Sequence, residues 1–384
     1  MAQPDSRPLL LLRHYKIFSG THGDTMNLHT FSPKKILVCQ LRQIGDVVLM
    51  TPLLELLKRR YPQAEIHVLT EKKCVPVLEN NPFLDRIWPI DKKKLSSLWR
   101  EVTYYREVAA QGFDLVVDLQ QLPRCRWVVF FSKAPVRLTH TPPWYTRWLY
   151  THGAAHGKGY ASAMKAAALA PLGITWQGER PLLELTDEEK TTAREYLASL
   201  GIAPGQTLVV VDATHRRDTR RWPSGHYAKL MDMAAKARPG LRFQILFGPG
   251  EEGIVDEITA ASDETGHILP AGRLLSLREM AACTKQASML IGNCSAPRHI
   301  AVAVGTPTLT IQGATSPGWV FPAPEHGYVS LGLECQPCNK NTCDTGTTCL
   351  TDLFPEAVLP HFLARLDAAA ENQRLSVFSP HTSP

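Results

Sequence analysis

Short apolar runs alternate with longer stretches of helical periodicity in the first half of the chain. The runs at 35–40, 65–70 and 114–119 predict buried strands, and the segments 47–60 and 97–110 predict helices. Continuous apolar runs, rather than strictly alternating ones, are typical of parallel strands that are covered on both faces. The pattern therefore predicts a parallel sheet with helices on both sides.

A second alternation of the same kind begins near residue 187. Its predicted strands are 207–213, 242–248, 288–293 and 306–313, and its predicted helices are 187–200, 224–237, 251–262, 276–286, 297–304 and 353–370. Two such patterns predict two doubly wound α/β domains, 34–180 and 187–365, facing across a cleft. Ligands of such sheets bind at the carboxyl ends of the strands, so the loops at those ends are the candidate sites.

The remaining segments lack clean periodicity. Residues 1–33 are predicted to form a disordered extension, and residues 371–384 a flexible tail. Residues 140–185, rich in Pro, Gly and His, predict surface loops around a helix, with the two halves joined near 171–186.

Composition and charge exclude several classes of protein. The net charge of the 384 residues is only +6, which argues against a nucleic-acid-binding protein. No apolar run approaches the roughly 20 residues that span a bilayer. Nine cysteines without a secretion signal favour a reducing compartment, so we expect a cytoplasmic protein.

The loop between the first predicted strand and helix ends in Gly45 and Asp46. A carboxylate at a helix start accepts backbone N–H bonds and complements the helix dipole, so Asp46 fits an N-cap. A carboxylate at the carboxyl end of a strand also fits a general base that removes a proton from a hydroxyl group. The sequence does not separate these two interpretations.

The segment 212–227, "DATHRRDTRRWPSGHY", follows a predicted strand and precedes a helix. The hydroxyl of Thr214 and the guanidinium groups suit a diphosphate, because arginine forms bidentate contacts with phosphate; the arginines are Arg216, Arg217, Arg220 and Arg221. A solvated charged loop is the alternative. The strand–loop–helix context favours phosphate binding.

Two further loops have the same context. In "GNCSAPRH", residues 292–299, Ser295 either caps the following helix or binds a phosphate, and His299 either donates to that anion or is structural. In "FGPGEE", residues 247–252, Glu251 or Glu252 either holds ribose hydroxyls or simply starts a helix.

Four cysteines lie within fifteen positions: Cys335, Cys338, Cys343 and Cys349. Four thiolates bind zinc tetrahedrally, so a structural zinc site is one interpretation. The spacing is not that of a standard zinc ribbon, and free thiols in a loop are the alternative.

These motifs together resemble glycosyltransferase family 9, the bacterial lipopolysaccharide heptosyltransferases. The resemblance rests on "ILVCQLRQIGDVVLMTPLLELLKRRYPQAEIHVLT", "DLVVDLQ", "TRRWP" and "SAPRHIAVAVGTPTLTIQGATSPGW", and it covers about residues 34–365. It implies the GT-B fold, with the acceptor on the N-terminal domain and a nucleotide sugar on the C-terminal one. It also implies inverting transfer from ADP-heptose to a lipid A–core acceptor, without a required metal.

The resemblance implies roles for individual residues. The family's catalytic base corresponds to Asp46, and its phosphate-binding lysine to Arg220. The expected donor-phosphate contacts are Thr214, Arg220, Ser295, Ala296 and His299. The expected ribose and base contacts are Glu251, Glu252 and Leu275. The expected acceptor contacts are Arg42, Gln120 and Arg124; the two arginines are chosen because their charge suits an anionic acceptor, and ordinary surface charges are the alternative. Peripheral contact with the inner membrane is expected through the lipid acceptor and a basic surface.

One position departs from the family. Cys294 stands where the family usually has an aspartate beside the donor sugar. A thiol neither carries that charge nor accepts comparable hydrogen bonds. Two alternatives to ADP-heptose transfer therefore stay open, a different nucleotide sugar or a non-catalytic member that binds nucleotide.

Overall fold

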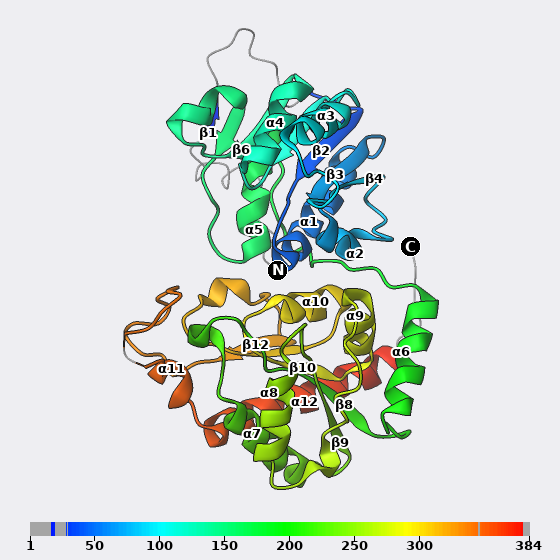
Figure 1. The fold of residues 1–384 in the computed structure, drawn as a ribbon, viewed down its shortest axis with the longest axis vertical. Coiled ribbons are helices and arrows are strands. Elements are labelled where there is room, and N and C mark those ends of the chain that lie inside the picture. The colour runs from blue at the N-terminus through cyan, green and yellow to red at the C-terminus, as the bar shows by residue number, and fades with distance from the viewer. Residues whose placement is uncertain (1–16, 20–27, 29, 345, 379–384) are drawn as a thin grey trace, which may run out of the picture. The chain divides into compact units, whose positions relative to one another are not determined.

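The computed structural model describes residues 17–19, 28, 30–344 and 346–378, and the chain divides into two compact units (Figure 1). Unit 1 is Met1–Pro181 and unit 2 is Leu182–Pro384. Each contains one largely parallel sheet with helices on both faces. The predicted α/β class with two Rossmann-like, doubly wound units is confirmed.

The sheet of unit 1 has seven strands in the order β1-β7-β6-β5-β2-β3-β4. In chain order they are β1 (Ile17–Ser19), β2 (Lys35–Cys39), β3 (Glu65–Glu71), β4 (Arg86–Ile90), β5 (Leu115–Asp118), β6 (Val136–His140) and β7 (His152–Ala154). The α-helices are α1 (Ile44–Arg60), α2 (Val75–Leu78), α3 (Leu98–Ala109), α4 (Pro123–Ser132) and α5 (Ala161–Ala166). The 3₁₀ helices are η2 (Lys72–Cys74), η3 (Trp144–Leu149) and η4 (Ala167–Leu172).

The predicted strands of unit 1 lie at the centre of its sheet. β2 pairs with β3 on one side and β5 on the other, and nearly all of their side chains are buried. Helix α1 packs against α2 and α5, while α3 packs against α4. The predicted continuous apolar runs are therefore strands enclosed between helical layers, as the pattern indicated.

Residues 17–19 belong to the segment 1–33 that is predicted to form a disordered extension. These residues form β1, which pairs antiparallel with β7 at the edge of the sheet. The physical reason is that β7 would otherwise present unpaired backbone N–H and C=O groups at that edge. Most of the remaining predicted extension lies outside the described residues.

The sheet of unit 2 has five parallel strands in the order β12-β11-β10-β8-β9. They are β8 (Thr207–Asp212), β9 (Leu241–Ile245), β10 (Met289–Gly292), β11 (Thr308–Ile311) and β12 (His326–Val329). Its α-helices are α6 (Asp187–Ser199), α7 (Ser224–Ala237), α8 (Glu252–Ala261), α9 (Leu277–Gln286), α10 (Ala296–Val304), α11 (Thr348–Thr351) and α12 (Pro355–Phe378). Its 3₁₀ helices are η5 (Asp218–Arg220), η6 (Thr265–His267) and η7 (Pro317–Trp319).

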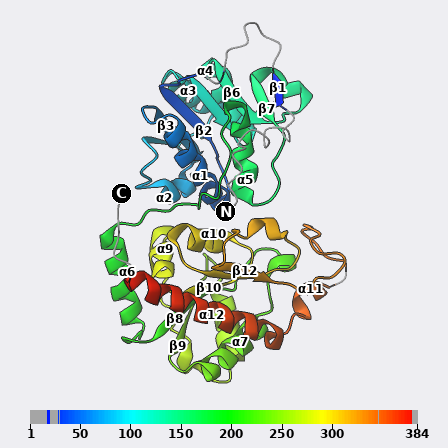
Figure 2. The same cartoon turned by 180° about the vertical axis from the view of Figure 1, so that it is seen from behind.

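Helix α12 closes the core of unit 2. It lies along α7 on one side of the sheet, as Figure 2 shows, and contributes Val358, Phe362 and Leu366 to the core. It continues to Phe378 instead of ending at residue 370 as predicted. The segment beyond residue 370 contains no glycine or proline until Pro380, so nothing in it stops the helix earlier. Residues 379–384 of the predicted tail lie outside the described residues.

Across the described part of the chain, no helix combines the length and the apolar character that crossing a membrane would require.

Candidate functional site

Asp46 lies in the first turn of α1, directly beyond the carboxyl end of β2. Helix α1 begins at Ile44 rather than at residue 47 as predicted, because Gln43 is its N-cap and Asp46 completes a capping box. The backbone N–H of Gln43 donates to Asp46 Oδ2 at 3.3 Å. One oxygen of the carboxylate therefore supports the start of the helix.

The other oxygen of Asp46 contacts a lysine that sequence reasoning missed. Lys165 of α5 donates from Nζ to Asp46 Oδ1 at 2.9 Å and to Gln40 Oε1 at 3.2 Å. The Lys165 side chain is 14 % exposed and that of Asp46 is 31 % exposed. The carboxylate is thus held from two sides while remaining accessible to solvent.

The three predicted acceptor contacts differ in what their side chains do. Gln120 accepts from the backbone N–H groups of Leu41 and Arg42, at 2.9 and 3.2 Å, and so fixes the loop that leads to Asp46. Arg124 donates to Glu101 from Nε at 3.2 Å and from Nη2 at 2.7 Å. The side chain of Arg42 is exposed. Acceptor contact by these residues stays a prediction.

In unit 2, the carboxyl ends of β8 and β10 come together at Asp212. This residue ends β8 and pairs in register with Gly292 of β10. A Cβ atom at Gly292 would lie 2.4 Å from the Asp212 carbonyl oxygen, so the two strands approach this closely because residue 292 has no side chain. The hydroxyl of Ser295 donates to the Asp212 carboxylate. Burial raises the pKa of Asp212 to about 7, and the charge of Glu251 adds to the rise.

Arg220 is a half-buried cation close to this point. Its Nε atom is buried and has no hydrogen-bond partner among the described residues. Burial lowers the pKa of Arg220, whereas the neighbouring thiols of Cys294 and Cys338 act to raise it. Burial and the charge of Arg220 together lower the pKa of His215 to about 4. An unpaired buried N–H group is costly, so an anionic ligand would satisfy Arg220.

Helix α10 begins beside the same residues. Ser295 is its N-cap and Ala296 its first residue, and the Ser295 side chain does not cap the helix because it binds Asp212. Backbone N–H groups in the first turn of a helix have no partner within the helix and suit an anion. Thr214 is buried nearby, where its backbone oxygen accepts from Asn293 Nδ2 at 3.4 Å.

His299 is engaged by a neighbour that the sequence reasoning did not single out. Arg298, which is buried, donates from Nη2 to His299 Nε2 at 3.0 Å and contacts Cys294 Sγ at 3.3 Å. Because arginine only donates, His299 Nε2 acts as an acceptor and offers no hydrogen to a phosphate in this arrangement. Arg298 instead brings a second cation to the start of α10.

The residues predicted to contact ribose and adenine lie on two loops. Glu251 accepts from the Gly248 backbone N–H at 2.9 Å, and its charge reaches Asp212. Glu252 is exposed as the first residue of α8, and Leu275 is half-buried just before α9. Glu251, Arg220 and Ser295 are therefore all associated with the same strand ends, whereas the contact of Leu275 with the base stays a prediction.

The four clustered cysteines do not form a metal site in this structure. Among the described residues, no three or more His, Cys, Asp or Glu side chains are grouped so that they could hold a metal ion. Cys335 and Cys343 are exposed, whereas Cys349 is buried. Burial raises the pKa of Cys349 to about 11, and the charges of the other three cysteines add to the rise. The cysteines are thus neighbours, but their side chains do not converge as four ligands.

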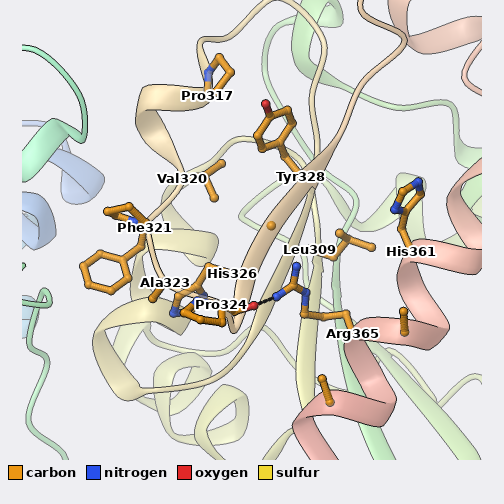
Figure 3. A pocket seen from close by; sticks show the side chains of 14 residues that line it. Leu309, Pro317, Val320, Phe321, Ala323, Pro324, His326, Tyr328, His361 and Arg365 are labelled. Carbon is orange, nitrogen blue, oxygen red and sulfur yellow. Dashed lines mark hydrogen bonds between the residues drawn. The ribbon is translucent and has the colours of Figure 1, made fainter.

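A pocket of about 780 Å³ lies at the β12 edge of unit 2 (Figure 3). Its lining includes Phe321, Tyr328 and Arg365, and the guanidinium of Arg365 donates to the Pro324 carbonyl oxygen. None of the predicted site residues lines it. The pocket is therefore separate from the residues gathered around Asp212.

Comparison with known proteins gives concordant matches. The model of glycosyltransferase family 9 (heptosyltransferase) matches residues 102–348. Lipopolysaccharide heptosyltransferase 3 of Escherichia coli is 28 % identical over 284 residues, which cover 72 % of this chain and 82 % of that protein. Lipopolysaccharide heptosyltransferase 1 of Pseudomonas aeruginosa is 24 % identical over 323 residues, or 80 % and 87 % of the two chains.

Solved structures show the same fold. The glycosyl transferase family 9 structure from Veillonella parvula has a TM-score of 0.78 at 23 % identity, covering 87 % of this chain and 98 % of that one. The ADP-heptose lps heptosyltransferase II of E. coli has a TM-score of 0.68 at 18 % identity, covering 87 % and 99 %. The predicted GT-B fold is confirmed by these similarities.

Proposed function

Since the chain belongs to glycosyltransferase family 9, we propose that it transfers heptose from ADP-heptose to the inner core of lipopolysaccharide, with inversion at the anomeric carbon. The chain is a glycosyltransferase by family, and its relatives include lipopolysaccharide heptosyltransferases. The observation that carries the proposal is the Asp46 carboxylate, accessible at the carboxyl end of β2 and held by Lys165.

The proposed reaction is a single displacement. Asp46 takes the proton of the acceptor hydroxyl while that oxygen forms a bond to the anomeric carbon of the donor. The bond between this carbon and the ADP phosphate oxygen breaks, and ADP leaves with the electron pair. Attack from the side opposite the leaving group inverts the configuration. This proposal assigns no role to a metal ion.

The charge on departing ADP needs stabilisation, and unit 2 offers groups of suitable chemistry. Arg220 has an unpaired N–H group, and the first turn of α10 offers backbone N–H groups. Positive groups placed where charge develops lower the barrier of such a reaction. We propose that Arg220, Ser295 and Ala296 bind the diphosphate, with Thr214 beside them.

Activity tests the proposal directly. The purified protein is incubated with ADP-heptose and a core acceptor truncated before its heptose, and the products are examined by mass spectrometry. We expect release of ADP together with an acceptor whose mass increases by one heptose. If the acceptor gains a sugar only with another nucleotide sugar, the fold and base assignment stand and the donor assignment is wrong.

Nucleotide binding tests the donor site separately. In calorimetric titrations we expect ADP to bind more tightly than UDP, GDP or CDP, and Arg220→Ala to weaken ADP roughly 10- to 100-fold, since it removes a charge-assisted contact. Arg216→Ala is the matched control, because Arg216 is exposed on the same loop. An equal loss of ADP affinity in both variants would indicate a general effect of positive charge on this loop rather than a specific contact of Arg220.

Lys165 is proposed as a positioning residue for the base. We expect Lys165→Met to lower kcat roughly 10²-fold, because Asp46 loses the contact that orients Oδ1 and small misplacements are costly in catalysis. ADP affinity should be unchanged, since the nucleotide is assigned to unit 2. Steady-state kinetics with Lys165→Arg, expected to restore part of kcat, and with the exposed Lys158→Met as control, check this prediction.

Cys294 supports one alternative donor. Its thiol contacts Arg298 where the family usually has an aspartate, so the groups that would face the donor sugar are altered. A nucleotide sugar other than ADP-heptose is the second candidate. A Cys294→Asp variant that gains activity with ADP-heptose at the expense of another donor would favour that candidate.

A further inference from the structure

Helix α4 is apolar on the face that it turns to solvent as well as on the face that it buries. Cys125, Val128 and Val129 are buried in the core of unit 1. Trp127 and Phe130 are 42 % and 48 % exposed. A surface helix of a globular protein normally carries polar residues on its outer side. An apolar outer face therefore indicates an interaction site for another protein or a membrane.

The 3₁₀ helix η3 extends this face. Trp144 is 87 % exposed and Trp148 is 66 % exposed, with the half-exposed Tyr145 between them. The ring of Trp148 meets that of Phe130 edge-on at 5.9 Å, so η3 and α4 form one continuous surface. The indole N–H of Trp148 donates to the Tyr145 carbonyl oxygen at 3.1 Å, which fixes the ring. We call these five exposed rings of Trp127, Phe130, Trp144, Tyr145 and Trp148 the aromatic surface.

Cationic residues accompany the aromatic surface. Helices α3, α4 and η3 together contain five arginines and two glutamates, and α3 packs against α4. The guanidinium of Arg126 lies 5.9 Å from the centre of the Tyr145 ring. Glu101, one of the two glutamates, is bound to Arg124. The exposed Arg147 stands within η3 itself. The charge of this region is therefore positive.

Exposed aromatic rings and arginines together suit one kind of partner. Tryptophan and tyrosine favour the boundary between water and lipid, where an apolar ring and its polar atom are both accommodated. Arginines beside them are attracted to anionic headgroups. An almost fully exposed tryptophan ring has no preformed pocket around it. Insertion into a lipid layer would therefore remove most of its apolar surface from water.

We propose that the aromatic surface of unit 1 docks into the headgroup region of an anionic lipid bilayer. The rings of η3 and α4 enter the boundary, and the surrounding arginines contact lipid phosphates. This goes beyond the proposed function and beyond the membrane contact expected through the lipid acceptor, because it assigns direct lipid contact to residues that take no part in the chemistry. It requires neither turnover nor a particular nucleotide sugar.

Vesicle sedimentation with the full-length protein tests the proposal. The vesicles contain either phosphatidylcholine alone or phosphatidylcholine mixed with phosphatidylglycerol. We expect binding to the anionic vesicles, weaker binding to the neutral ones, and a decrease as salt is raised from 0.05 to 0.5 M, because surface charges are then screened. A protein that does not sediment with anionic vesicles even at low salt would overturn the proposal.

A combined Trp144→Ser and Trp148→Ser variant gives the decisive comparison. We expect at least tenfold weaker partitioning onto anionic vesicles, with ADP affinity retained. Retained ADP affinity separates this result from a failure of the donor site. The matched control combines Tyr328→Ser and Phe354→Ser, two aromatic residues of unit 2 that are also about half exposed, and should bind vesicles normally.

Two results would contradict the proposal. Unchanged vesicle binding by the Trp144/Trp148 variant would mean that other residues bind lipid. A wild-type dimer that becomes a monomer in this variant, without any lipid binding by either protein, would identify the aromatic surface as a contact between two copies of the chain. Sedimentation velocity distinguishes this second case.

Discussion

Asp46→Asn is expected to lower kcat by roughly 10²- to 10⁴-fold, the range that general-base catalysis contributes. The asparagine carbonyl oxygen can still accept a hydrogen bond from Gln43 or Lys165, so the start of α1 should be preserved. An amide, however, takes up no proton from the acceptor hydroxyl. Initial-rate measurements of ADP release at saturating donor and acceptor check this expectation.

The control for this variant lies on the same helix. Glu55 forms an exposed ion pair with Arg59 at 2.5 Å, and Glu55→Gln should leave turnover nearly unchanged. ADP affinity should be the same in wild type and in both variants. Full turnover by Asp46→Asn would show that the base assignment is wrong and leave Asp46 as a helix-capping residue alone.

Asp212→Asn is expected to make unit 2 more stable at neutral and alkaline pH. Burial holds the pKa of Asp212 near 7, whereas the reference value is 3.8. At pH values between 3.8 and about 7, the Asp212 carboxyl group is ionised in the unfolded chain and protonated in the folded chain. The free energy of unfolding therefore falls as pH rises through this range. Above pH 7 this loss is on the order of 4 kcal/mol in the wild type, and the asparagine variant does not undergo it.

Urea unfolding at pH 4, 6 and 8 measures this effect. The variant and the wild type should differ little at pH 4, and the advantage of the variant should grow up to about pH 7 and then level off. Asp256→Asn, at an exposed position of α8, should show no such growth. A constant difference between Asp212→Asn and wild type at all three pH values would contradict the assigned cause. Because the chain divides into two compact units, the transition of unit 2 should be followed by itself.

The same ionisation bears on nucleotide binding. Ser295, which donates to Asp212, is one of the residues proposed to bind the diphosphate. Ionised Asp212 would repel a phosphate at the start of α10, so the proposed donor site favours the protonated form. Burial raises the pKa of Asp212 and so favours the uncharged form, which would repel a phosphate less than the carboxylate does.

The strands that could be predicted are those buried on both faces. β2, β5 and β8 each contain an uninterrupted apolar run, at 36–39, 115–117 and 208–211, and such runs are distinctive in a sequence. The sequence does not predict β4 and β6, because "RIWPI" and "VRLTH" mix exposed or half-exposed polar residues with buried ones. It does not predict helix α4 either, since aromatic residues on the outer face of this helix remove the amphipathic period by which a surface helix is usually detected.

The candidate site was predictable where a motif follows a strand. Asp46, Arg220 and Ser295 stand in such loops, and the loop position indicates which end of the sheet they occupy. Lys165 is 119 residues from Asp46 along the chain, in an alanine-rich helix with no motif of its own. Its contact with Asp46 depends on how α5 packs against α1, which local sequence does not reveal. Arg298 has a similar explanation, because its role depends on burial against Cys294 and His299.

Gly292 has a practical consequence for engineering sugar specificity. Its missing side chain is what lets β10 approach Asp212, so a library that randomises this position would contain mostly misfolded members. Cys294, two residues further on, belongs to the loop and contacts Arg298 through its side chain. A search for variants with a new donor preference should therefore keep position 292 as glycine and concentrate its diversity on position 294 and the loop that carries Arg220.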